Sequence, residues 1–239
     1  MILVITFLLG LFFLSGAAAA ALSANAKKIE GISISVAAGA MSALAAADIL
    51  PEILAEMGGI SLIRAVLFTA AGVVFLKALD RFVPEHHGDE KSPGAVIHIG
   101  IISAFAIILH NVIEGMAVYE LGAASLRQGI IFAAGVGLHN IPMGMLVYST
   151  LKEETKIKKY AVIFAVMIST FAGGLVMAAL GGYMSHTLID LLTCVTLGMI
   201  IYIVAFELIP YMVSHRNYRV YAAGIAAGFA IVLVSVLFE

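Results

Sequence analysis

Residues 95–120 read AVIHIGIISAFAIILHNVIEGMAVYE, an apolar run that is long enough to cross a bilayer as one helix. Polar side chains interrupt this run at His110, Asn111 and Glu114. A polar side chain inside a bilayer is costly unless another group compensates it. His110 and Glu114 are four residues apart, so an imidazole and a carboxylate lie on one helical face, and both are ligands of Zn²⁺. The stretch therefore predicts a membrane-spanning helix that carries a metal site.

A second stretch, residues 139–148, repeats this pattern. It reads HNIPMGMLVY against HNVIEGMAVY at residues 110–119, with His, Asn, Gly, Met, Val and Tyr at matching places. Hydrogen bonds between helices would be an ordinary role for a single intramembrane histidine. A duplicated His-Asn pair with Glu114 one turn away favours metal binding instead. The repeat adds His139 and Asn140 to the candidate residues.

The composition fixes the class of protein. Hydrophobic residues make up 62% of the chain and charged residues 12%, with a mean hydropathy of +1.10, which excludes a soluble domain of 239 residues. We therefore expect an all-α integral membrane protein. The net charge of −2 argues against a nucleic-acid partner. Cys194 is the single cysteine, so no internal disulfide can form, and we expect it to pack as a small apolar residue.

Apolar runs of about 20 residues match the thickness of a bilayer core. The Ala-rich end of the first run resembles a signal-peptide cleavage region, but no Lys or Arg precedes it as in a secretory signal, so we expect it to remain as a helix. Residues 1–239 are thus predicted to form one transmembrane domain. Its eight helices are expected at roughly 2–22, 31–57, 60–82, 95–120, 127–151, 159–184, 188–213 and 218–238.

Basic residues gather on alternate loops and predict the orientation. Ten lie on one side, whereas the other side holds Arg64 and Arg127. Since cytoplasmic loops retain Lys and Arg, both termini are predicted to be extracytoplasmic. The loop at 83–94, with His86 and His87, is predicted to be cytoplasmic, where its histidines are either solvated or handle metal transiently. The ten basic residues are Lys27, Lys28, Arg81, Lys91, Lys152, Lys156, Lys158, Lys159, Arg216 and Arg219.

Three further carboxylates lie within the spans, close to prolines. Asp48 and Glu52 flank Pro51 in the second span, and Glu207 precedes Pro210 in the seventh. Proline bends a helix and leaves a carbonyl one turn earlier without its amide partner. Transporters use such broken helices to hold cations. The alternative for Glu52 is that it simply reaches water near a helix end.

Together these residues resemble the ZIP (Zrt/Irt-like) family of divalent metal transporters over essentially the whole chain. Residues 110–115 match its fourth-helix motif, His-Asn-x-x-(Glu/Asp)-Gly, in full. Residues 139–144 match its fifth-helix motif, His-Asn-x-Pro-Glu-Gly, except at Met143. The resemblance implies an eight-helix bundle with inverted three-helix repeats, helices 1–3 and 6–8, around helices 4 and 5. It also implies import of zinc, or of iron, manganese or cadmium, toward the cytoplasm.

The resemblance gives the candidate residues roles. His110, Glu114 and His139 would be ligands of a first metal site, and Asn111 and Asn140 would belong to a second, adjacent site.

The same resemblance implies a route out of that site. Glu207 and the pair of Asp48 and Glu52 would line it. A homodimer is a further possibility, because glycines such as those in residues 173–174 and 224–228 permit close helix contact, although they serve internal packing equally well.

Two methionines depart from the family pattern. Met143 stands where the fifth-helix motif has Glu, and residues 174–178 read GLVMA where the family usually has Gly-Leu-Val-Glu-Pro, which puts Met177 at a second carboxylate position. Thioether sulfur is a poor ligand for borderline dications and a better one for soft ions. We therefore expect one metal rather than two, although core packing alone could account for each methionine.

Three functions remain open on the sequence. The first and favoured one is a secondary transporter, with a metal cation as substrate, the lipid bilayer as partner and no organic cofactor, since no Gly-rich ATP-binding loop is visible. The second is an intramembrane zinc-dependent hydrolase, in which a carboxylate would act as base, but we find no nucleophile and no second histidine cluster to support it. The third is a membrane protein that binds metal without moving it. We expect no enzymatic activity.

Overall fold

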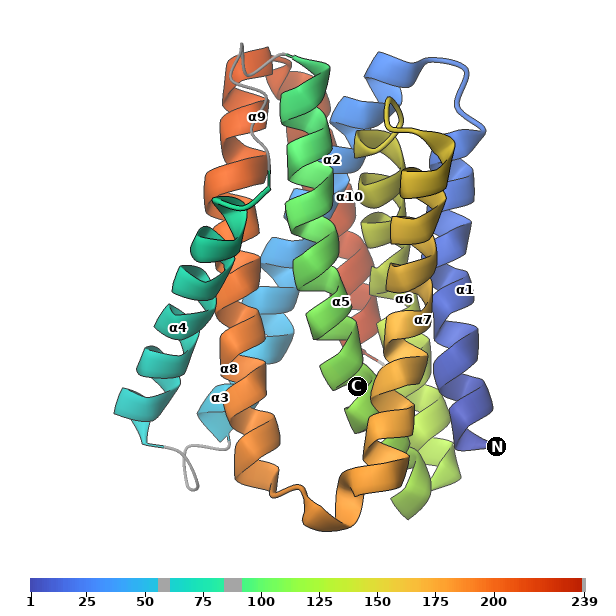
Figure 1. The fold of residues 1–239 in the computed structure, drawn as a ribbon, viewed down its shortest axis with the longest axis vertical. Helices are drawn as coiled ribbons and strands as arrows, with labels where there is room; N and C mark the ends of the chain where they lie inside the picture. Colours follow the sequence, from blue (N-terminus) through green and yellow to red (C-terminus); the bar gives the residue numbers. More distant parts are fainter. Residues whose placement is uncertain (56–60, 84–91, 238–239) are drawn as a thin grey trace.

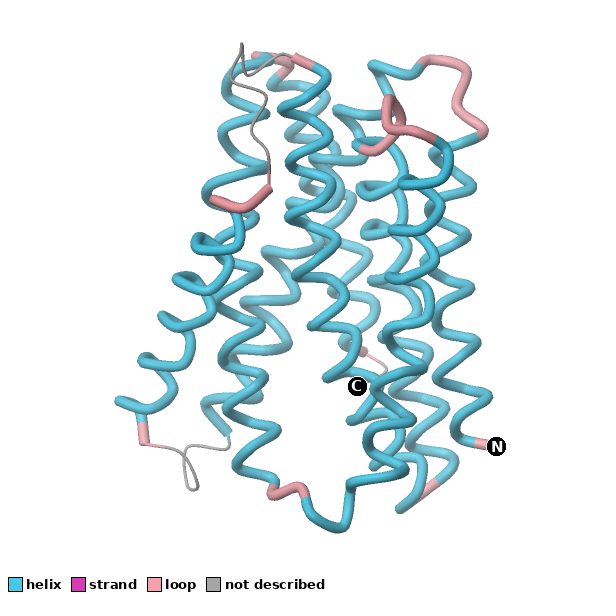
Figure 2. Tube along the Cα trace, viewed as in Figure 1, coloured by secondary structure: helices cyan, strands magenta, loops and turns pink. Residues whose placement is uncertain are grey.

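The structure is a computed structural model that describes residues 1–55, 61–83 and 92–237. All regular structure in these residues is helical, and eight rods are long and apolar enough to cross a membrane. Figure 1 shows the helices side by side in an upright bundle, and Figure 2 shows short loops at described junctions such as that between α6 and α7. The predicted all-helical fold with eight spans is confirmed.

Six spans are uninterrupted helices. These are α1 (Ile2–Ala21), α4 (Leu62–Asp80), α5 (Pro93–Ala124), α6 (Leu126–Thr150), α7 (Lys156–Leu180) and α10 (Tyr218–Val236), and a short turn, η3 (Gly181–Tyr183), follows α7. The other two spans are interrupted by a wider turn. One runs from α2 (Ala26–Ala43) through η1 (Leu44–Ile49) into α3 (Leu50–Ala55), and the other from α8 (His186–Tyr202) through η4 (Ile203–Leu208) into α9 (Ile209–His215).

Side-chain caps shift some predicted boundaries. The Asn25 side chain accepts a hydrogen bond from the Lys28 amide at 3.0 Å, so the second span begins at Ala26 rather than at residue 31. The Ser92 hydroxyl caps α5 in the same way, and α5 extends to Ala124, four residues beyond the predicted end. Lys27 and Lys28, which follow this cap, suggest a loop by their charge, yet they lie in the first turn of α2. The histidines of the 83–94 loop, His86 and His87, lie outside the described residues.

The interruptions η1 and η4 are π-helical turns that hold the carboxylates near proline. Asp48 lies in η1 before Pro51, and Glu207 lies in η4 before Pro210. A proline lacks the amide that the preceding turn needs, and the chain accommodates this with a wider turn, a feature often found at functional sites. The two spans run in opposite directions along the bundle.

Glycines divide the helices into three groups of closely packed neighbours. Where a glycine meets the backbone of another helix, an added Cβ would overlap it, so only glycine allows the approach. The glycine contacts join α1, α5, α6 and α7 into one bundle, and they join α2 to α10 and α4 to α8 as pairs. Cβ-to-carbonyl-oxygen distances of 1.9–2.1 Å illustrate these contacts: Gly144 to Phe13, Gly173 to Val112, Gly39 to Ile225, Gly228 to Val36 and Gly72 to Val195.

We name the two ends of the molecule after the view in Figure 1. The lower end carries the start of α1 and the end of α10, together with α3, the end of α5 and the start of α8. The upper end carries the starts of α2 and α5 and the whole of α9. The helices that carry the candidate residues His110, Glu114 and His139 are α5 and α6, two of the four helices of the glycine-packed bundle.

Candidate metal centre

Three predicted ligands converge between α5 and α6. One oxygen of Glu114, Oε1, lies 2.8 Å from Nε2 of His110 and 2.7 Å from Nε2 of His139. All three residues are buried, His139 completely. One ligand atom from each lies within 4.8 Å of the others, a spacing that one metal ion can bridge. We call these three residues the metal centre.

The rigidity of the centre follows from its supporting helices. His110 and Glu114 are one turn apart on α5, which fixes their relative position. Glycine contacts hold α5 against α7 and α6 against α1, so the backbones that carry the three ligands have little room to shift. Two imidazoles and a carboxylate match the three protein ligands of zinc sites that keep a fourth position open.

A cavity leads from the centre to the lower end. Its volume is about 760 Å³, and His110 and Glu114 line its inner part. Four more carboxylates line it from four different elements: Asp48, Glu52, Glu120 and Asp190. Exposed lining residues form its outer part: Glu52 on α3, and Leu121 and Ala124 at the end of α5. The cavity therefore offers a cation a wet and acidic approach to the centre.

The sequence profile that describes the ZIP zinc transporter family matches residues 81–235, more than half of the chain, including every ligand of the centre. The chain belongs to the ZIP family. It is also similar to the zinc transporter ZupT of Corynebacterium efficiens, with 28% identity over 242 residues that cover 93% of this chain and 90% of that protein.

Membership of the ZIP family settles the broad class of activity. The chain is a metal transporter of the membrane rather than an enzyme, so the hydrolase alternative is not supported. Divalent metal is its substrate class. The eight apolar rods agree with an integral membrane protein.

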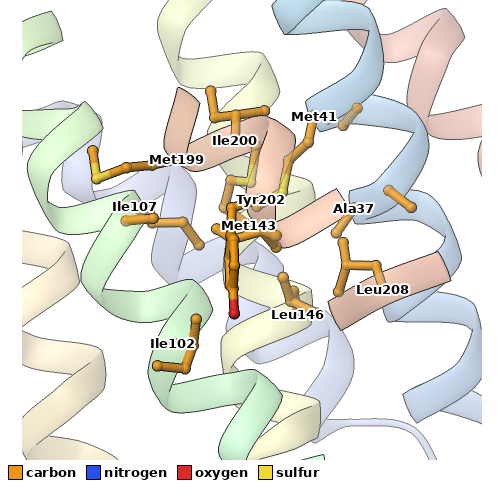
Figure 3. Close-up of a cluster of buried hydrophobic side chains, with 14 of the residues drawn as sticks. Ala37, Met41, Ile102, Ile107, Met143, Leu146, Met199, Ile200, Tyr202 and Leu208 are labelled. Carbon is orange, nitrogen blue, oxygen red and sulfur yellow. The ribbon is translucent and has the colours of Figure 1, made fainter. Parts of the chain in front are cut away.

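The residues expected to form a second metal site are buried inside the bundle. Asn111 and Asn140 are each 1% exposed, and among the described residues Oδ1 of Asn111 and both amide atoms of Asn140 have no hydrogen-bond partner. Met143 packs in an apolar cluster with Met41, Leu146 and Tyr202 (Figure 3). Unsatisfied polar atoms thus remain on both asparagines, whereas Met143 offers a second dication no charge.

The structure differs from the expectation that Asp48, Glu52 and Glu207 line one route. Asp48 and Glu52 line the cavity on the lower side of the centre. Glu207 lies with Asp80 and His98 toward the upper end. Because the second and seventh spans run in opposite directions, similar carboxylate-proline segments reach opposite sides of the centre.

Sequence analysis did not find the group around Glu207, which we call the upper cluster: Asp80, His98, Tyr202 and Glu207. Ligand atoms of Asp80, His98 and Glu207 all lie within 4.8 Å of one another. Nε2 of His98 is 2.6 Å from Oδ1 of Asp80, and the Tyr202 hydroxyl donates to Oδ2 of Asp80 at 3.0 Å. The available signal was that His98 is a second histidine inside the fourth span, three turns before His110.

Proposed function

We propose that this protein carries a divalent transition-metal cation, zinc above all, across the membrane toward the cytoplasm, with His110, Glu114 and His139 as its ligands in the middle of the route. The observation that carries the proposal is the sharing of one Glu114 oxygen by two buried histidines. Without a cation, this arrangement concentrates polar groups in a helical bundle where they are costly. A bound cation would compensate them.

The chemistry of the ligands supports zinc over harder ions. Imidazole nitrogen suits zinc, iron and copper, whereas magnesium and calcium prefer an all-oxygen set. Manganese, iron and cadmium remain acceptable to two imidazoles and a carboxylate. The name of the Corynebacterium efficiens relative supports the same choice.

The charge distribution supports a cytoplasmic upper end. The loop between α6 and α7 and the first turn of α2, which carry many of the basic residues, lie at the upper end. Positive loops stay on the cytoplasmic side, so we assign both termini to the outside. We also propose that residues 1–239 form one transmembrane domain and that loop 83–94 faces the cytoplasm.

The route follows from this orientation. A cation would enter the cavity from outside and approach along its carboxylates, Asp48 and Glu52 among them. It would exchange water for the three ligands of the centre and leave past Glu207 and the upper cluster. One cation at a time is favoured, because Met143 is packed in the apolar core and contributes no charge.

The bilayer and a second copy of the chain are the remaining proposed partners. α4 and α10 expose many large apolar side chains, which lipid tails would cover. The glycines at 173, 174, 224 and 228 all contact helices of the same chain. A homodimer would therefore have to use other residues.

Zinc uptake into vesicles that contain the purified protein tests the proposal. The wild type should accumulate zinc, whereas His110→Ala, Glu114→Ala and His139→Ala should each reduce uptake to the background. His215→Ala, a histidine at the end of α9, is the matched control and should retain uptake. Normal uptake by His139→Ala would refute the assignment of the centre, and binding without any uptake by the wild type would favour the metal-binding alternative.

The orientation has its own test. In a Cys194→Ala background, Gln128→Cys at the lower end should react with a membrane-impermeant thiol reagent added outside intact cells. Thr155→Cys at the upper end should react only after permeabilisation, since both positions are exposed on the protein. The reverse pattern would invert the orientation.

A further inference from the structure

Asp80 is held by two different helices at once. It is the last residue of α4, and its two carboxylate oxygens have separate partners. His98 of α5 is 2.6 Å from Oδ1, and Tyr202, the last residue of α8, donates to Oδ2 at 3.0 Å. Only 19% of the Asp80 side chain and 10% of the His98 side chain are exposed. Hydrogen bonds to a charged group in such a setting are among the stronger ones in proteins.

One of these bonds joins two of the glycine-packed groups, and the other, from Tyr202 to Asp80, lies within one group and fixes the Asp80 carboxylate. His98 belongs to α5 and hence to the bundle that carries the metal centre, whereas Asp80 and Tyr202 belong to the α4 and α8 pair. Between α4 and α8, Gly72 and Gly198 each contact the backbone of the other helix. No described glycine makes such a contact between the bundle and this pair. The contact of His98 with Asp80 therefore ties together two bodies that are otherwise less closely packed.

The tie lies on the opposite side of the centre from the cavity. The cavity reaches the centre from the lower end, between η1, α5 and α8. The upper cluster lies between α4, α5 and η4, and Tyr202 directly precedes η4, the wide turn that holds Glu207. In this conformation the centre is reached from below, while three helices are bound to one another above it.

We propose that Asp80, His98 and Tyr202 form a latch that holds the upper end closed while the centre is accessible from the lower end, and that the departing cation opens this latch by binding the Asp80 carboxylate and the His98 imidazole. This inference rests on the proposed function for the cation that opens the latch, but not for the latch itself.

The chemistry explains why a cation would be the opening signal. A dication competes directly for the carboxylate and imidazole atoms that hold the latch, and Glu207 is near enough to complete its ligand set. Binding of the cation exchanges a bond between two helical groups for bonds to the ion. Closure of the upper end and release of cargo then depend on the same atoms, and the latch forms again when the ion leaves.

A distance measurement between spin labels tests the latch without any metal. Labels at Phe82→Cys, beside the end of α4, and Thr155→Cys, between α6 and α7, report the separation of the pair from the bundle at the upper end, in a Cys194→Ala background. Both positions are exposed. In metal-free vesicles the wild type should give one main distance. His98→Ala removes the bond between the two groups and should raise the population of a second distance about fivefold, as loss of one hydrogen bond predicts. Tyr202→Phe leaves that bond in place but frees the Asp80 carboxylate to turn away from His98, so it should raise this population by less.

Tyr211→Phe is the matched control. Its hydroxyl donates to Oε1 of Glu30 at 2.7 Å, also a bond between tyrosine and carboxylate, but it joins α9 to α2 and does not involve the Asp80 carboxylate. It should leave the distances unchanged. Unchanged distances in His98→Ala would overturn the latch, as would an equal effect of Tyr211→Phe. Unchanged distances in Tyr202→Phe, whose ring still stacks on Phe206, would remove Tyr202 from it.

An experiment with added zinc distinguishes the role of the latch from that of the metal centre. In the wild type, zinc should populate the same second distance, and a lack of this effect would refute opening by the cation. In the His139→Ala variant, zinc supplied from the lower side should no longer raise the population of the second distance. Adding Tyr202→Phe to this variant should still raise that population in metal-free vesicles. If the proposed function is wrong and the latch is right, only the response to zinc disappears.

Discussion

The metal centre and the upper cluster use the same kinds of side chain in opposite ways. The centre has two histidines around one carboxylate, all on α5 and α6 of a single glycine-packed bundle. The upper cluster has one histidine and two carboxylates, on α4, α5 and η4, which belong to different groups. The first arrangement has fixed supports, and the second joins parts that have fewer close backbone contacts.

This difference indicates that backbone packing decides what a group of ligands can do. Preorganised ligands bind a cation without paying to assemble the site. Ligands on separate groups bind one another until something intervenes. On our proposals, the same residue types would hold a cation in one place and hold helices together in the other.

The largest expected effect comes from removing the carboxylate that the centre shares. Glu114→Gln keeps the side-chain volume and removes the charge. Loss of a group that only supports a ligand weakens metal binding by up to about 100-fold, so loss of the proposed ligand itself should weaken zinc binding by more than that. Asp80→Asn in the upper cluster should weaken it by less than about tenfold. Isothermal titration with zinc measures both, and equal losses would show that the two groups do not differ as we describe.

The second largest effect should come from a substitution that disturbs the glycine contacts between the helices that carry the centre. Gly173→Leu would drive a side chain into the Val112 carbonyl, 1.9 Å from the added Cβ, and overpacking of this kind costs about 1–3 kcal/mol or more. We expect a lower melting temperature and weaker zinc binding. Gly181→Ala is the control, because its Cβ would meet only the Met177 side chain at an ordinary 3.5 Å. Equal melting temperatures would mean that the bundle is not tightly held.

The methionines offer a gain of function at the centre. Met143→Glu together with Met177→Glu adds negative charges at the two positions where the ZIP motifs have Glu, which we expect to complete a second site with Asn111 and Asn140. The number of zinc ions bound per chain should rise from one to two, as measured by elemental analysis after gel filtration. Folding must be checked with metal present, since buried carboxylates repel one another without it. Two ions in the wild type, or one in the folded double variant, would contradict the role that we give these methionines.

The carboxylates of the cavity should matter least. Asp48→Asn removes one charge of several along a wet cavity, where salt screens it. We expect the zinc concentration for half-maximal uptake to rise by about threefold at low ionic strength and by less at high salt. An effect as large as that of Glu114→Gln would place Asp48 among the ligands rather than along the approach.

Much of the fold was predictable, because bilayer thickness fixes the length of each span and apolar runs show it directly. The convergence of His110 and Glu114 follows from helical periodicity, and the duplicated motif indicated His139. The upper cluster could not be predicted in this way. A loop separates Asp80 from His98 in the sequence, and Tyr202 lies 122 positions from Asp80. Such contacts depend on how helices pack, which residue spacing alone does not reveal. The direction of each span explains why Asp48 and Glu207 lie apart, although their local sequences are alike.

X-ray absorption at the zinc edge tests the central claim most directly. The sample is the purified protein with one equivalent of zinc and with His86 and His87 changed to alanine, so that loop histidines cannot contribute. We predict a shell of nitrogen and oxygen at about 2.0–2.1 Å with two imidazoles and no sulfur. A shell with sulfur at about 2.3 Å, or with no imidazole, would contradict the assignment of His110, Glu114 and His139 as the ligands of the transported ion.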